Sequence, residues 1–150
     1  MEIELGEFLF KVSAAAVAGL TMGLERQFKK KHAGLKTNAL VAIGAAVFVI
    51  ICLPFMDENS TDMTRIVGQI VVGVGFLGAG VILQPEGKEK EVKGLATAAT
   101  IWCSAAAGCL AGFGIYIPLL VLAGVVVIVN SLFGFLNQIV KEKVDESERE

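Results

Sequence analysis

Long apolar stretches, separated by short polar segments, dominate the pattern of the chain. Five of them are long and apolar enough to cross a bilayer as helices, and they cover about residues 8–24, 37–54, 66–83, 95–113 and 117–137. The last break contains no charge, but two glycines, a proline and a tyrosine lie between residues 112 and 118, and these are turn signals. The pattern predicts an all-α integral membrane bundle of five transmembrane helices.

The lengths of the apolar stretches exclude other architectures. From Leu95 to Leu136 there are 42 residues without a charge, whereas one transmembrane helix needs only about 20. A membrane β-barrel would instead show segments of about ten residues that alternate between apolar and polar, and no such alternation occurs. We expect one five-helix domain over 1–140 and a charged tail, 141–150, that extends the last helix and then frays.

Basic residues fall on alternate sides of the five predicted spans. Eleven of the 13 lie in three segments: the loop after the first span, the loop after the third, and the tail. Only Lys11 and Arg65 fall on the other side. Because cytoplasmic loops are enriched in Lys and Arg, we expect the N-terminus outside and the C-terminus in the cytoplasm. The first span is not read as a cleaved signal peptide, since its basic cluster follows the apolar stretch.

Composition supports a membrane protein and excludes several function classes. The chain is 55% hydrophobic and 19% charged, with a mean hydropathy of +0.70 and a net charge of −2, which argues against a nucleic-acid surface. His32 is the single histidine, and no nucleophile–base pair is evident, so we expect no enzyme activity. Three cysteines inside apolar stretches are expected to be free thiols, although a bridge between Cys52 and Cys109 stays open.

An internal repeat relates two segments at an offset of 60 residues. Residues 34–39 and 94–99 share the pattern Gly-Leu-x-Thr-x-Ala, and each copy follows a basic loop. This similarity favours a parallel duplication of a helix pair, with one extra helix. The alternative is a shared helix start at which the threonine caps free backbone N–H groups.

Polar residues within or beside the spans are candidates for function because unpaired polar groups are costly in hydrocarbon. On the cytoplasmic side they are Glu25, Arg26, Gln27, Lys36, Thr37 and Thr97, and on the outer side they are Asp62, Arg65 and Gln69. The alternatives are a snorkelling interfacial pair at the first cluster and a simple helix cap at Asp62. Asn130 needs an amide partner within the bundle, and Trp102 lies at mid-span, so both are expected in the core. Thr97, Thr100 and Ser104 mark the fourth helix, but hydroxyls can bond to their own helix.

Acidic residues near the third span are a possible metal site. Mg²⁺ is usually held by a few carboxylates and its own waters, which makes Asp57, Glu58 and Asp62 candidate ligands. We expect no resident cofactor, with Mg²⁺ association left open.

Glycines recur at spacings that allow helices to approach closely. The third span contains a formal Gly-x-Gly-x-x-Gly motif, but it lacks the strand–turn–helix context of a phosphate loop. Its glycines are therefore read as helix-packing positions, with tight packing within the bundle preferred and a homodimer seam left open. The eight glycines read in this way are Gly19, Gly23, Gly73, Gly75, Gly78, Gly80, Gly108 and Gly112.

An ordered set of motifs resembles one family. It runs from Gly23-Leu24-Glu25-Arg26-Gln27 through Gly34-Leu35-Lys36-Thr37-Asn38, Asp62-Met63-Thr64-Arg65 with Gln69, and Gly73 to Gly80, to Gly94-Leu95-Ala96-Thr97 with Trp102. Between about residues 19 and 116 the chain is similar to the membrane domain of the MgtC/SapB family. It departs from the family pattern at Lys36, where an arginine is usual, at Met63, where a proline is usual, and at Ala96, where a threonine is usual. Many relatives also carry a cytoplasmic ACT-like domain after the last helix, which this sequence does not include.

The resemblance implies a multi-pass protein of the bacterial inner membrane, linked to growth at low Mg²⁺ and to intracellular survival. It also implies a non-enzymatic modulator of another membrane complex, such as the F-type ATP synthase, with Glu25, Arg26, Thr37, Asp62, Arg65, Gln69, Thr97 and Trp102 as functional residues. The competing hypothesis is a small Mg²⁺ channel or transporter, supported by polar residues near both ends of the bundle. Expected partners are the lipid bilayer, a membrane protein complex and a second copy, with no nucleic acid.

Overall fold

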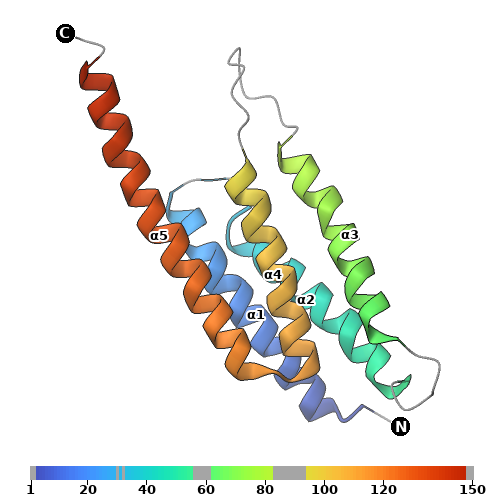
Figure 1. Ribbon diagram of the computed structural model, residues 1–150. Coiled ribbons are helices and arrows are strands. Elements are labelled where there is room, and N and C mark those ends of the chain that lie inside the picture. The colour runs from blue at the N-terminus through green and yellow to red at the C-terminus, as the bar shows by residue number, and fades with distance from the viewer. Residues whose placement is uncertain (1–2, 30, 32, 56–61, 83–93, 148–150) are drawn as a thin grey trace.

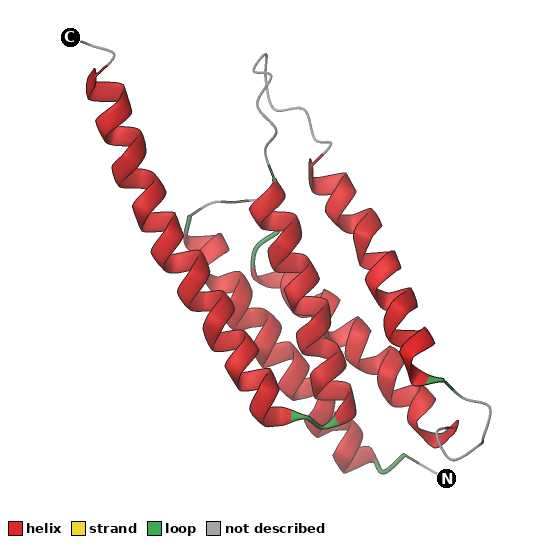
Figure 2. Cartoon of the chain, viewed as in Figure 1, coloured by secondary structure: helices red, strands yellow, loops and turns green. Residues whose placement is uncertain are grey.

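The computed structural model describes residues 3–29, 31, 33–55, 62–82 and 94–147, with side chains up to residue 132. Every regular element in these residues is a helix (Figure 2). The helices are α1 Leu5–Phe28, α2 Leu35–Cys52 with the 3-10 turn Leu53–Phe55, α3 Met63–Ile82, α4 Leu95–Phe113 and α5 Tyr116–Ser147. The predicted all-α bundle of five helices is confirmed.

Four of the helices are long and apolar enough to cross a membrane, namely α1, α2 with its 3-10 turn, α3 and α4. Within the described side chains, the apolar part of α5 is the shorter segment Tyr116–Leu132. The backbone of α5 continues to Ser147, so the tail extends the last helix, while residues 148–150 and position 83 of the third predicted span lie outside the described residues.

The reversal within the long uncharged run occurs at Gly114. This residue has the left-handed φ of +77° at the C-cap of α4, a conformation that glycine adopts without steric cost. Its N–H donates to Ala111 O at 3.0 Å, and the N–H of Ile115 donates to Leu110 O at 2.9 Å, as in a helix-terminating Schellman motif. Pro118 then falls in the first turn of α5, where its missing N–H costs nothing. The glycine–proline signal therefore marks a real helix break.

The ends of the helices that adjoin basic segments lie together. In Figure 1 the C-terminal ends of α1, α3 and α5 and the N-terminal ends of α2 and α4 lie toward the upper side, and the N-terminus lies at the opposite side. The fold thus has the alternation on which the topology prediction depends. Which side is cytoplasmic stays a prediction.

Helices α1, α2 and α4 form the packed centre, and small residues make it possible. Ala15, Ala42, Ala46, Ala107 and Ala111 are fully buried. Small side chains let helix backbones approach closely, which is how helices associate in lipid. The core is therefore a contact between backbones more than between large side chains.

Four glycines lie at these close contacts. A Cβ on Gly19 would lie 2.5 Å from Asn38 O of α2, and one on Gly112 would lie 2.7 Å from Val49 Cβ. Gly23 meets the backbone at Gly34, and Gly108 meets the Ala42 carbonyl. Atoms of the same chain thus occupy the space in which a side chain would lie at each of these four glycines.

Helix α3 is attached differently. Its buried residues are Val74 and Gly78 alone, and a Cβ on Gly78 would lie 3.4 Å from Ala98 Cβ of α4. A Cβ on Gly73, Gly75 or Gly80 would meet no atom of the described residues within 4 Å. The intramolecular packing that the sequence favoured for these three glycines is therefore not found, because α3 rests mainly on α4 at the edge of the bundle (Figure 1).

Candidate functional site: a polar network on α4 and a groove between α2 and α3

Three hydroxyl side chains form a polar face on α4. Thr97, Thr100 and Ser104 are spaced so that they share one side of the helix, and at most 5% of each is exposed. Each of them bonds to a different neighbouring helix. The network explains why the centre of an apolar bundle contains polar groups, since a polar side chain in lipid needs a partner.

At the cytoplasmic end predicted from the sequence, Arg26 of α1 donates from Nη2 to Thr97 Oγ1. Arg26 is only 2% exposed, so it lies inside the bundle and does not snorkel. Lys29 Nζ lies 2.6 Å from Glu25 Oε1, an ion pair outside hydrogen-bond geometry. Within the described residues, Arg26 Nε and both Glu25 oxygens have no hydrogen-bond partner.

Asn38 joins α2 to α4 at the centre of the network. It is fully buried, and its Nδ2 donates to the carbonyls of Ala33 at 2.8 Å and Gly34 at 2.9 Å. Its Oδ1 accepts from Ser104 Oγ at 2.8 Å. Sequence reasoning did not select Asn38, because an asparagine near a helix start reads as a local cap; only its position between the two helices shows its role.

Asn130 brings α5 into the network. Its Nδ2 lies 3.3 Å from Thr100 Oγ1, and the Thr100 hydroxyl donates to Ala96 O at 2.8 Å. The side-chain amide of Asn130 thus has a hydrogen-bond partner within the bundle, and Asn130 is half-buried. Trp102, in contrast, is 52% exposed on α4, so its expected core position is corrected: it lies on the helix face away from Thr97, Thr100 and Ser104.

The outer cluster does not form a bond across the bundle in the described residues. Asp62 Oδ1 accepts from the Thr64 N–H at 2.9 Å and the Thr64 hydroxyl at 2.5 Å, so Asp62 caps the start of α3. These two bonds and the nearby Arg65 charge lower the pKa of Asp62. Arg65 and Gln69 are both exposed, which differs from the inward-pointing ridge that their spacing suggested.

The candidate metal ligands are only partly placed. Asp57 and Glu58 lie outside the described residues. Among the residues that the structure does describe, no three His, Cys, Asp or Glu side chains come together. Cys52, Cys103 and Cys109 are free thiols, so the bridge between Cys52 and Cys109 does not form.

Lys11 is a buried cation that sequence reasoning missed. It is 6% exposed, and its Nζ lies 2.5 Å from Glu7 Oε1, one helical turn away. The four-residue spacing of opposite charges was the available signal. This pair belongs to the N-terminal end of α1, far along the helix from Arg26.

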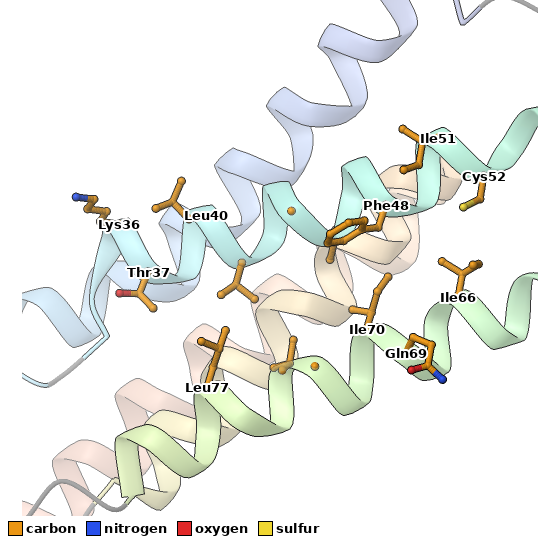
Figure 3. Close-up of a pocket in the computed structure, with 15 residues that line it drawn as sticks. Lys36, Thr37, Leu40, Phe48, Ile51, Cys52, Ile66, Gln69, Ile70 and Leu77 are labelled. Carbon is orange, nitrogen blue, oxygen red and sulfur yellow. The ribbon is translucent and has the colours of Figure 1, made fainter.

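An apolar groove of about 930 Å³ separates α2 from α3 (Figure 3). Lys36 and Thr37 lie at one end on α2, and Gln69 lies toward the other end on α3. The remaining lining is aliphatic or aromatic apart from Cys52 and two glycines, Gly44 and Gly73. Of the predicted cytoplasmic cluster, Lys36 and Thr37 line one end of this groove and are exposed. Arg26 and Thr97 are buried, and Gln27 lies against Gly34.

The threonines of the repeat have different roles. Both α2 and α4 begin after a glycine N-cap without a side-chain cap hydrogen bond. Thr97 accepts from Arg26, and Thr37 lines the groove. A shared helix start capped by threonine therefore does not explain the repeat, and the duplication stays a prediction.

The long apolar helices and their buried polar network define an α-helical membrane protein. The model of the MgtC family matches residues 12–139. The chain is 52% identical over 114 residues to the uncharacterized protein slr0014 of Synechocystis, covering 76% of this chain and 47% of that protein. It is 50% identical over 107 residues to protein MgtC of Salmonella typhimurium, covering 71% of this chain and 44% of the relative.

Protein MgtC of Brucella abortus is 45% identical over 130 residues, covering 87% of this chain and 52% of the relative. No solved structure matches the chain. The chain belongs to the MgtC family, as the motifs predicted. It spans about half the length of the curated relatives that it matches.

Proposed function

We propose that this protein is a non-enzymatic modulator of a larger membrane complex and that it acts through contacts between transmembrane helices. The observation that carries the proposal is the exposed small-residue face of α3. Helix α3 has 20 residues, yet among the described residues only Val74 and Gly78 of this helix are buried. A transmembrane helix that its own bundle barely covers has the surface to pack against a helix from another protein.

The exposed face of α3 has the composition that favours close helix packing. Gly68, Val72, Gly75 and Ala79 recur at spacings of four, three and four residues and so share one side of the helix. No described atom lies within 4 Å of a Cβ position on Gly68 or Gly75, and Val72 is 58% exposed. Gly75 and Ala79 form a small-xxx-small pair of the kind found at membrane helix interfaces.

Four of the eight candidate packing glycines pack within the bundle, so they do not form the homodimer seam that the sequence left open. Gly19, Gly23, Gly108 and Gly112 lie against α2 or its preceding loop, so the contact surface proposed here is on α3. The polar groups of the bundle support the same function, because Thr97, Ser104 and Asn130 bond to other helices. Their role is then to hold the scaffold and not to line a path for a cation.

Membership of the MgtC family directs the choice of partner and setting. By the family resemblance, we propose location in the bacterial inner membrane, a role in adaptation to low Mg²⁺, and the F-type ATP synthase as the complex that is modulated. A second copy of the chain is the competing occupant of the α3 face.

The test uses inverted membrane vesicles from a bacterium that lacks its own MgtC-family protein and expresses the tagged chain. We expect the wild type to lower proton-driven ATP synthesis and to copurify with ATP synthase subunits. Gly75→Leu should remove both effects, because it places a bulky side chain on the contact face. Gly124→Leu is the matched control, because Gly124 is exposed on α5 and a Cβ there meets no described atom within 4 Å, and it should keep both effects. Unchanged ATP synthesis with well-expressed wild type would refute the proposed target.

A further inference from the structure

A second surface, independent of the α3 contact face, is the groove between α2 and α3. Its walls expose large apolar side chains, with Leu40 56%, Phe48 57% and Leu77 50% exposed. Along α2 the groove runs from Lys36 to Cys52, which is about 24 Å at 1.5 Å per residue. It therefore extends through most of a hydrocarbon core of about 30 Å.

The charge in the groove is confined to one end. Among the described residues of its lining, Lys36 is the only ionisable side chain besides the Cys52 thiol, and the two stand at opposite ends (Figure 3). Lys36 also lies in the first turn of α2, an 18-residue helix whose N-cap, Gly34, makes no side-chain cap hydrogen bond. The first N–H groups and the positive end of the helix dipole add to the lysine charge at this end. A ligand that complements the groove has an anionic head and an apolar tail.

Glycines widen the groove at mid-depth on both walls. Gly44 follows Lys36 by eight residues, or about 12 Å along the helix, and Gly73 lies on α3 between Leu77 and Ile66. In the part of the chain that the structure describes, no atom lies within 4 Å of a Cβ position at Gly44 or Gly73. One leaflet is about 15 Å deep, half of the hydrocarbon core, so an acyl chain whose head is at Lys36 ends in this wide section.

From this charge and shape, we propose that the groove between α2 and α3 binds an anionic phospholipid from the leaflet at the Lys36 end. The phosphate lies at the Lys36 ammonium and the start of α2, and an acyl chain lies between Leu40 and Leu77 as far as Gly44 and Gly73. A zwitterionic lipid fits the same apolar space but has a cation that opposes Lys36. The site therefore selects by headgroup charge.

Native mass spectrometry of the whole chain in detergent tests the proposal, with dioleoyl phosphatidylglycerol and dioleoyl phosphatidylcholine as probes. One basic residue near an anionic headgroup corresponds to an about fivefold preference for phosphatidylglycerol. We expect Lys36→Gln to abolish that preference and Lys36→Arg to keep it. Lys31→Gln is the charge control, since Lys31 is exposed and outside the groove, and it should keep the preference.

Filling the groove separates a built site from general adsorption. Gly44→Leu should lower binding of both lipids at least tenfold without harming the fold, because its side chain enters open space. Gly124→Leu adds the same side chain to an exposed position on α5, outside the groove, and should bind lipid like the wild type. Equal binding of the two lipids by the wild type, or equal binding by the two leucine variants, would overturn the proposal. A dimer that Gly44→Leu dissociates would assign the groove to a second copy and would overturn it as well.

Discussion

The hydrogen bond between Asn38 and Ser104 makes a quantitative prediction about the stability of the bundle. Asn38→Ala removes two bonds to the carbonyls of Ala33 and Gly34 and one from Ser104. At about 0.5–1.5 kcal/mol for each of the three bonds, it should lower the free energy of unfolding by about 1.5–4.5 kcal/mol. Ser104→Ala should cost less, about 0.6 kcal/mol on average for a bond between membrane helices.

The shared bond is isolated by a double-mutant cycle. Ser104 Oγ also lies 3.0 Å from Thr100 O, so in Asn38→Ala the hydroxyl turns to that carbonyl and stays satisfied. The coupling free energy of the two substitutions then measures the bond from Ser104 to Asn38 and should be about 0.6–1.7 kcal/mol. Without the bond, the effects of the two substitutions would add.

The free energies come from reversible unfolding of the wild type, the two single variants and the double variant. Each protein is titrated with dodecyl sulfate in mixed micelles and followed by far-UV circular dichroism. Ser131→Ala is the matched control, because Ser131 is an exposed serine on α5, and it should leave the midpoint unchanged. Additivity within about 0.3 kcal/mol would refute the assignment of Asn38 as the link between α2 and α4.

Three further predictions follow from the packing, the cap and the polar clusters. Gly108→Ala should destabilise the bundle by about 1–3 kcal/mol, because its methyl group would meet the Ala42 carbonyl. Gly75→Ala should not destabilise the bundle. The same unfolding titration compares the two variants, and equal effects would contradict the packing described for Gly108. The pKa of Asp62 is lowered in the folded chain, so its cap on α3 contributes fully above the unfolded pKa of about 3.9 and is lost as pH falls through the lower folded value. The protection factor of the Thr64 amide, from which the intrinsic pH dependence of exchange is removed, should therefore fall at that pH, and Asp62→Asn should remove this fall. A protection factor that does not change with pH in the wild type would argue against the cap. Liposomes containing the protein should admit no more Mg²⁺ or K⁺ under an imposed potential than empty ones, and flux that Asp62→Ala and Arg65→Ala abolish would favour a transporter.

Helix number and position were predictable because bilayer thickness fixes the length of an apolar segment. The break at Gly114 was predictable for a similar reason, since a left-handed C-cap followed by proline has few alternatives. A hydrogen-bond partner for Asn130 within the bundle was predictable, because a side-chain amide in lipid needs one. Its identity as Thr100 depends on how α5 packs, which no local pattern encodes.

The roles of the glycines were harder to predict. Gly19 and Gly75 occur in equally suggestive patterns, yet within the described residues only Gly19 lies against another backbone. A small residue shows where close approach is possible, and only the tertiary fold shows which helix approaches. The core position predicted for Trp102 was wrong for the same reason. The depth of a residue in the membrane does not determine whether its side of the helix faces the bundle.

Site-specific photo-crosslinking in native membranes tests the central claim that α3 presents the contact face. A benzophenone amino acid would replace Phe76 of α3, which is 76% exposed, or Leu120 of α5, which is 72% exposed. The two sites are matched in exposure, so both report equally on chance encounters. We predict a protein adduct of defined mass from position 76 and none from position 120. The absence of a protein adduct at position 76, or the same adduct from both positions, would contradict the account.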